Sequence, residues 1–144
     1  MKRRVLIDLN VVLDVLLDRA PHAEASAALW AAVETGEAEG LLAAHCVTTL
    51  HYLASRSGGR EFGDRCVADV LSVFTVAPLD AGVLESALSL GWSDFEDAVC
   101  AASATRSGCQ FIATRDPRGF KCSTCPALAP KEALVAIRSP VPDG

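Results

Sequence analysis

SDFEDAVCAASATRSGCQFIATRD, residues 93–116, is the stretch that decides the fold. Its pattern is that of a helix, a glycine turn, a buried strand and a carboxylate just past the strand. Ser93 and Glu96 have the Ser-x-x-Glu spacing of a capping box, which predicts that the helix begins here. Gly108 ends the helix, and the short apolar run CQFIAT that follows has the length of a strand. Asp116 comes where this strand leaves the core.

A second strand followed by a carboxylate opens the chain, with the sequence VLIDLN at residues 5–10. The apolar residues predict a buried strand over 3–7 that closes at Asp8. Either Asp8 or Asn10 is placed to cap the buried helix expected over 11–18. The same arrangement of strand and acid therefore occurs twice, far apart in the chain.

The rest of the chain also alternates between strands and helices. Helices are expected at about 22–35, 46–55, 60–71, 80–90 and 130–138, and strands at 41–44, 72–76 and 127–129. This alternation predicts an α/β fold with parallel strands and helices on both faces of the sheet. We expect a single domain over residues 1–138 and a flexible C-terminal tail over 139–144.

The acids at the strand ends are the candidate functional residues. In open α/β sheets the reactive crevice lies beyond the carboxyl ends of the strands, where the strand order reverses. If the first and fourth strands are neighbours there, Asp8 and Asp116 converge. Asp97, at the start of the preceding helix, faces the same crevice, with Asp94 three residues earlier on the same helix face. Because hard divalent cations bind oxygen ligands, we predict a Mg²⁺ site at these carboxylates, capable of activating water.

Each acid also has a purely structural explanation, and these alternatives stay open. Asp8 can simply cap the next helix. Asp94 and Asp97 can serve only the dipole of their helix. Asp116 precedes Pro117, a position typical of a turn.

Basic residues flank the expected site. Arg115, Arg118 and Lys121 are candidates to contact phosphates, although solvated surface is the simpler expectation for each alone. Other acids on helix faces, such as Asp14, are expected to be solvated.

Composition narrows the class of protein. The chain has 144 residues and a formal net charge of -5, which argues against a broad nucleic-acid-binding surface but not against a local one. No apolar run approaches the roughly 20 residues of a membrane span. Asp8 and Asn10 interrupt the apolar segment that a signal peptide needs after the basic start, so we expect a cytoplasmic protein.

The cysteines and histidines show no ligand set in their spacing. The six cysteines are Cys46, Cys66, Cys100, Cys109, Cys122 and Cys125. We expect free thiols, because cytosolic chains stay reduced. Cys122 and Cys125 have the spacing of a metal or redox pair, but no second pair exists to complete a zinc site, and their role stays open.

Three motifs together resemble the PIN-domain family, the metal-dependent ribonucleases that include VapC-type toxins. They are VLIDLN followed by VVL, DFEDA at residues 94–98, and IATRD at residues 112–116 with Gly119 and Phe120 beyond. The resemblance implies a three-layer α/β/α sandwich with a central parallel sheet of four or five strands. It also implies Mg²⁺ or Mn²⁺, hydrolysis of RNA, frequent homodimers and, for toxins, a small antitoxin encoded nearby.

Two positions depart from the family pattern. Thr49 stands at or near the place of a glutamate in the helix after the second strand, and Gly119 stands where an acid often precedes the phenylalanine. Despite these two departures we expect a metal-dependent endoribonuclease that is the toxin of a toxin–antitoxin pair, with Asp8, Asp97 and Asp116 as ligands and Asp94, Asn10 and Thr49 in support. The alternative is a catalytically weakened module that binds RNA or protein.

Other α/β enzymes fit less well. A phosphatase of the haloacid dehalogenase type would need Asp-x-Asp after the first strand, and Asn10 occupies the second position. A dinucleotide enzyme would need Gly-x-Gly-x-x-Gly, which the sequence lacks.

Overall fold

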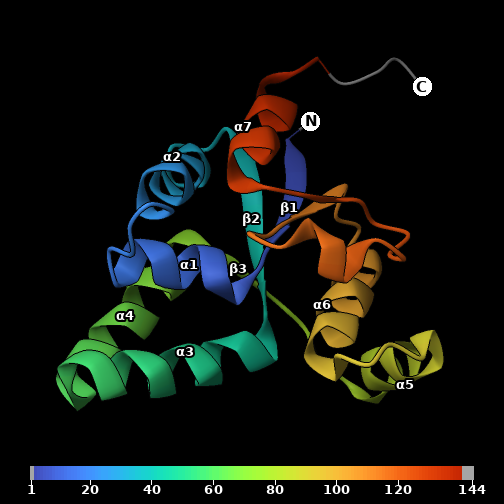
Figure 1. Ribbon diagram of the computed structural model, residues 1–144, viewed down its shortest axis with the longest axis horizontal. Helices are drawn as coiled ribbons and strands as arrows, with labels where there is room; N and C mark the ends of the chain where they lie inside the picture. The colour runs from blue at the N-terminus through green and yellow to red at the C-terminus, as the bar shows by residue number, and fades with distance from the viewer. Residues whose placement is uncertain (1, 141–144) are drawn as a thin grey trace.

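The chain folds around a sheet of five parallel strands in the order β3-β2-β1-β4-β5 (Figure 1). The computed structural model describes residues 2–140. The strands are β1 (Arg3–Ile7), β2 (Ala38–Ala43), β3 (Thr75–Ala77), β4 (Phe111–Ala113) and β5 (Ala127–Leu128). The predicted parallel α/β/α sandwich is confirmed.

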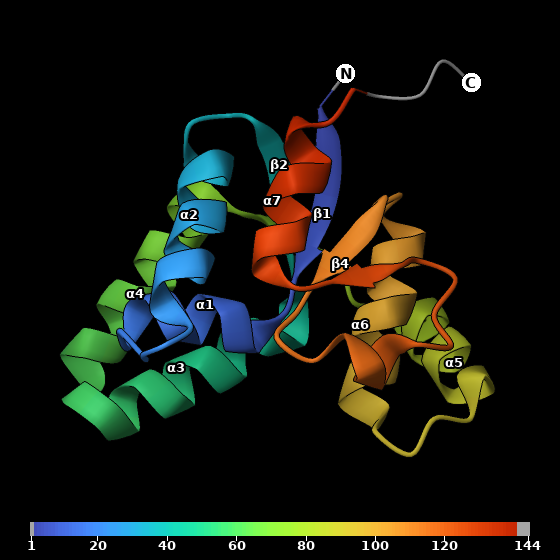
Figure 2. The same ribbon diagram turned by 45° about the horizontal axis from the view of Figure 1, so that its top comes forward.

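Seven α-helices and one short 3₁₀ helix connect the strands within residues 2–140. They are α1 (Leu9–Leu16), α2 (Ala23–Glu34), α3 (Ala44–Gly58), α4 (Arg60–Val73), α5 (Ala81–Leu90), α6 (Phe95–Arg106), η1 (Pro117–Phe120) and α7 (Pro130–Arg138). Figures 1 and 2 show α5 and α6 on one side of the sheet, with α1, α2, α4 and α7 on the other. None of the helices in the described residues is long and apolar enough to cross a membrane.

Alternating residues of the central strand β1 enter two separate cores. Val5 and Ile7 pack with the cluster beneath α1, α2 and α7, whereas Leu6 packs with the cluster beneath α6. Side chains of a strand point alternately to its two faces, so a strand covered on both faces is apolar throughout. This explains the unbroken apolar run before Asp8.

Three of the α-helices in the described residues, α1, α5 and α6, begin with a side-chain cap, and one of these caps corrects a prediction. Asp80 caps α5 through its side chain, and Asp8 caps α1, one of the two caps predicted for that helix. The central helix α6, however, begins one residue later than the Ser93 capping box predicts. Asp94 is its N-cap and accepts a hydrogen bond from the backbone N–H of Asp97.

The other boundaries agree within a few residues. The last helix has the predicted bounds, and β2 begins at Ala38, three residues before the predicted strand. Gly40 in that extra segment lies where an added Cβ would approach Phe74 and Val33 to 2.8 Å, so the strand passes tightly beneath two core side chains. Of the expected tail, residues 141–144 lie outside the described part of the chain.

The strand order of the sheet reverses direction at β1. The chain starts in the centre with β1, adds β2 and β3 on one side, and then returns to pair β4 with the other side of β1. Ile7 lies opposite Ala113 in this pairing, and the N–H of Asp8 donates to the carbonyl of Ala113 at 2.9 Å. The acids that follow β1 and β4 therefore emerge side by side, as a pairing of the first and fourth strands requires.

Candidate metal centre

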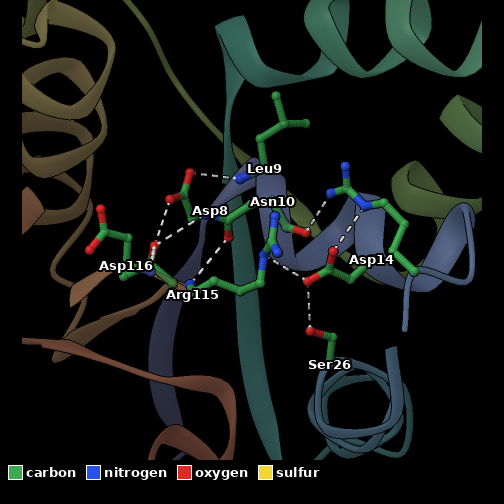
Figure 3. A network of polar contacts seen from close by, with 9 residues as sticks. Asp8, Leu9, Asn10, Asp14, Ser26, Arg115 and Asp116 are labelled. Carbon is green, nitrogen blue, oxygen red and sulfur yellow. Dashed lines mark hydrogen bonds and ion pairs between the residues drawn. The ribbon is translucent and has the colours of Figure 1, made fainter. Parts of the chain in front are cut away.

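Asp8 is held from two sides at the end of β1 (Figure 3). Its Oδ1 accepts a hydrogen bond from the N–H of Leu9 at 2.8 Å, and its Oδ2 accepts one from the hydroxyl of Thr114 at 2.8 Å. Burial raises the pKa of the Asp8 carboxyl, and these two hydrogen bonds oppose that rise. The cap and the functional candidate are thus the same side chain, fixed in one orientation.

Asp97 lies among other carboxylates at the start of α6. Burial comes first among the causes that raise its pKa to about 6, followed by the negative charges of Asp94 and Asp8 and the weaker effect of Asp116. Burial and nearby negative charges both raise the pKa of a carboxyl, so the direction of this shift agrees with acids gathered near Asp97. Asp94, Asp97 and Asp116 line one pocket, and the hydroxyl of Thr114 links Asp8 to the backbone of Asp116.

Gly119 lies beside two of these acids, at the position where the family pattern often has an acid. An added Cβ here would stand 3.0 Å from Oδ2 of Asp97 and 3.9 Å from Oδ2 of Asp116. Those two oxygens are therefore both within 4 Å of a single point. Glycine at this position leaves that space open between them.

Thr114 connects Asp8, Asn10 and Asp116, and it was not among the residues predicted from the sequence. Its buried hydroxyl donates to Asp8 and accepts a hydrogen bond from the N–H of Asp116 at 3.2 Å. The side-chain amide of Asn10 lies 3.5 Å from the same hydroxyl, and its Oδ1 accepts from the N–H of Arg115 at 3.3 Å. The sequence signal that could have identified Thr114 is its position directly after β4, the strand that pairs with β1.

A pocket opens next to the acids on the side of α6 and η1. It has a volume of about 440 Å³, and Asp94, Asp97 and Asp116 line it together with Arg118 and Lys121. Acidic and basic side chains thus line the same pocket. This arrangement suits an anionic substrate, because the basic side chains could bind it while the acids hold a metal ion.

Arg115, the other predicted phosphate contact, is already paired. Its Nε lies 3.0 Å from Oδ2 of Asp14, and Arg19 Nε lies 3.0 Å from Oδ1 of the same carboxylate (Figure 3). The hydroxyl of Ser26 lies 3.5 Å from Asp14 as well. The expectation that Asp14 is solvated was wrong: its side chain is fully buried.

Thr49 makes its hydrogen bond within its own helix. Its hydroxyl donates to the carbonyl of His45 at 3.4 Å, and within residues 2–140 no hydrogen bond links it to the four acids. Its supporting role stays a prediction.

The two loop cysteines lie in different surroundings. The buried Cys125 thiol donates to the carbonyl of Cys109, whereas Cys122 is exposed and lines the pocket.

The donor set fits a hard divalent cation. Asp8, Asp94, Asp97 and Asp116 offer only oxygen atoms, which Mg²⁺ and Mn²⁺ prefer. After burial, the negative charges of neighbouring acids contribute to the raised pKa of Asp97, and a bound cation would offset those charges.

Known proteins share both the sequence pattern and the fold. The PIN domain family matches residues 4–118. Among solved structures, VapC20 of Mycobacterium tuberculosis, a toxin that cleaves the sarcin–ricin loop, superposes with a TM-score of 0.63 at 18% identity, covering 75% of this chain and 86% of that one. VapBC2 of Rickettsia felis, bound to a promoter DNA fragment, superposes with a TM-score of 0.68 at 14% identity, covering 87% of this chain and 96% of that one.

A toxin–antitoxin complex of Klebsiella pneumoniae gives a TM-score of 0.66 at 16% identity, covering 88% of this chain and 97% of that one. At such identities the likeness concerns the fold alone. No curated protein sequence matches the chain. Because the family match spans most of the sequence, the chain belongs to the PIN-domain family, whose members are generally nucleases.

Proposed function

We propose that this protein is a metal-dependent endoribonuclease that hydrolyses RNA phosphodiesters. The proposal is supported by two geometric observations: Asp94, Asp97 and Asp116 line one pocket, and Oδ2 of Asp97 and Oδ2 of Asp116 both lie within 4 Å of the point where a Cβ on Gly119 would stand. Nucleases of this family typically use divalent metal ions. Asp8, Asp97 and Asp116 would hold Mg²⁺ or Mn²⁺, and Asp94 would assist.

The chain's own residues supply orientation and substrate binding. Thr114 and the N–H of Leu9 fix the Asp8 carboxylate, and Asn10 ties the segment after β4 to α1. A bound ion would supply a Lewis acid that activates water and offsets charge on the phosphodiester. Arg118 and Lys121 line the same pocket as the acids and would bind backbone phosphates of the RNA.

The biological role that we propose is that of a toxin in a toxin–antitoxin pair, acting in the cytoplasm. The support is the fold shared with VapBC2 and with the Klebsiella pneumoniae complex, both of which were solved as toxin–antitoxin systems. A small antitoxin would be the protein partner and RNA the substrate. A homodimer is the assembly that we expect.

The test is cleavage of RNA by the purified chain. We expect cleavage that needs Mg²⁺ or Mn²⁺, stops with a chelator, and falls by at least about a hundredfold in Asp8→Asn, Asp97→Asn and Asp116→Asn, since even outer partners of a metal ligand contribute 10–100-fold. Asp69→Asn, an exposed acid on α4, is the matched control and should keep full activity. Cleavage that persists without metal, or in Asp8→Asn, would overturn the proposal.

A second candidate function is a PIN-like module that binds RNA or protein without cutting. Thr49 and Gly119 favour it, because each stands where the family pattern has an acid. Calorimetry separates the two: Mn²⁺ binding that Asp116→Asn abolishes counts for the nuclease, whereas RNA binding with no cleavage at any Mn²⁺ concentration counts for the module.

A further inference from the structure

Two cysteines and a histidine meet on the side of the sheet that α6 covers. His45 and Cys46 lie in the first turn of α3, and Cys100 lies on α6. The Sγ of Cys46 is 3.8 Å from Nε2 of His45 and 3.9 Å from Sγ of Cys100, and Cys100 Sγ is 3.9 Å from His45 Nε2. The three atoms form a nearly equilateral triangle.

We infer that His45, Cys46 and Cys100 form a zinc site, separate in donor chemistry from the carboxylates. A tetrahedral ion lies out of the plane of three ligands, and for a triangle with these sides it would stand about 2.4 Å from each atom, the side multiplied by √(3/8). Zinc bonds measure about 2.3 Å to sulfur and about 2.0–2.1 Å to nitrogen. An ion there would therefore bind all three ligands after side-chain shifts of a few tenths of an ångström.

The donor set selects the ion. Thiolate and imidazole are ligands for Zn²⁺, whereas Mg²⁺ requires oxygen. Two cysteines and one histidine form a known zinc ligand set that leaves a fourth position for water. Within residues 2–140 this is also the one group of three or more His, Cys, Asp or Glu whose ligand atoms all lie within 4.8 Å of one another.

Metal binding to these three residues would release protons. Zinc binds cysteine as thiolate and histidine as neutral imidazole, so binding would displace the thiol protons of Cys46 and Cys100 and any proton on Nε2 of His45. We therefore expect the Zn²⁺ affinity to depend on pH.

Access and affinity follow from the burial of the three residues. Cys46 and Cys100 are 4% and 3% exposed, whereas His45 is half-buried, so an ion would enter past the imidazole. The Nδ1 atom of His45 has no hydrogen-bond partner in the described part of the chain. Bound imidazoles are usually held by such a partner, so we expect exchangeable zinc rather than an ion required for folding.

Zinc at this place would join α3 to α6. Cys100 follows Asp97 by one turn of α6, so the ion would restrain the helix that carries one of the candidate magnesium ligands. Binding to the folded chain alone would also raise its melting temperature.

Cobalt reports the geometry of the site. The purified full chain, stripped of metal and kept reduced with a phosphine, is titrated with Co²⁺ and then with Zn²⁺. We expect one equivalent of Co²⁺ to give thiolate charge-transfer and tetrahedral d–d bands, Zn²⁺ to abolish them, and excess Mg²⁺ to leave them unchanged.

Variants identify the ligands. Cys46→Ala, Cys100→Ala and His45→Gln should each weaken Zn²⁺ binding by at least about tenfold and remove the rise in melting temperature. His45→Gln is the safest for folding because its side chain is partly exposed. Cys66→Ala, another buried cysteine on α4, is the matched control and should bind as the parent does.

Three results would overturn the inference. One is the absence of tetrahedral cobalt bands in the parent chain. A second is bands that survive in both Cys100→Ala and His45→Gln. The third is bands lost in Cys122→Ala, which would assign the metal to the loop cysteines. Asp116→Asn, in contrast, should keep the cobalt spectrum, because its carboxylate belongs to the magnesium candidate.

Discussion

The hydroxyl of Thr114 donates a hydrogen bond of 2.8 Å to Oδ2 of Asp8, although the two residues are 106 positions apart. This bond exists because β4 pairs with β1, which brings the two strand ends together. Thr114 is buried and Asp8 is partly buried, and hydrogen bonds to both of its carboxylate oxygens hold the side chain in one orientation.

Replacing Thr114 should therefore affect the metal centre through Asp8. Thr114→Val removes the donor at nearly constant shape, and the pKa of Asp8 should rise further because its hydrogen bond from Thr114 is lost. We expect Mn²⁺ affinity and RNA cleavage to fall by about 10–100-fold. Thr114→Ser keeps the hydroxyl and should retain most of both; equal losses in the two variants would show that only packing matters.

Asp97→Asn should stabilise the metal-free protein while abolishing its activity. The pKa of Asp97 is raised to about 6 in the folded chain, above its ordinary value of 3.8. Between these values the folded state binds more protons than the unfolded state, so stability falls as pH rises through that window. At pH values above this window, the ionised Asp97 side chain destabilises the folded state.

Urea unfolding in the presence of a chelator measures this effect. The parent chain should be more stable at pH 5 than at pH 7, and Asp97→Asn should remove this contribution to the difference. Because Asp97 is partly solvated, the change should be modest. A parent chain that gains stability between pH 5 and 7, with no influence of the substitution, would contradict the raised pKa.

The buried Asp14 should depend on its two arginines jointly. In Arg19→Met or Arg115→Met the carboxylate keeps one ion pair, whereas the double variant leaves a buried charge without a partner. We expect the double substitution to cost about 3–5 kcal/mol, more than the sum of the single changes.

Denaturant unfolding of the two single variants and the double variant gives the coupling free energy between Arg19 and Arg115. Arg138→Met, which breaks an exposed pair with Glu37, is the control and should cost at most about 1 kcal/mol. Simple additivity of Arg19→Met and Arg115→Met would mean that solvent reaches Asp14.

Gly119→Ala should disturb the centre without unfolding the chain. The added Cβ would stand 3.0 Å from Oδ2 of Asp97, so that carboxylate must move by a few tenths of an ångström. Geometry errors of this size at a metal ligand are costly, and we expect activity to fall by on the order of tenfold at low Mg²⁺.

Gly82→Ala is the matched control for this substitution. Gly82 lies on α5, away from the four acids of the candidate metal centre. Its added Cβ would stand 3.2 Å from the Arg106 side chain and 3.3 Å from the Asp80 side chain. Activity should be unchanged in Gly82→Ala, and both variants should melt close to the parent. A Gly119→Ala variant with full activity and unchanged Mg²⁺ dependence would show that Asp97 has room to adjust.

Some features of the site were accessible from the sequence because they depend on neighbours in the chain. Asp8 follows an apolar strand and precedes a helix, so its place at a strand end was evident from the residues on either side. The same holds for Asp116 after β4 and for Asp80 at the start of α5. The cap of α6 was misplaced by one residue because Ser93 and Asp94 are both good caps, and local pattern does not separate them.

The sequence by itself determined the alternation of strands and helices and the acids at their ends, because burial on both faces of a parallel sheet requires unbroken apolar runs that only the strand ends interrupt. The tertiary structure alone decided that Thr114 orients Asp8, that Arg115 neutralises Asp14, and that Cys100 meets His45 and Cys46. Each of these contacts joins segments that are distant in sequence. They are fixed by the pairing of β1 with β4 and by the packing of helices onto the sheet, which no local pattern of residues specifies.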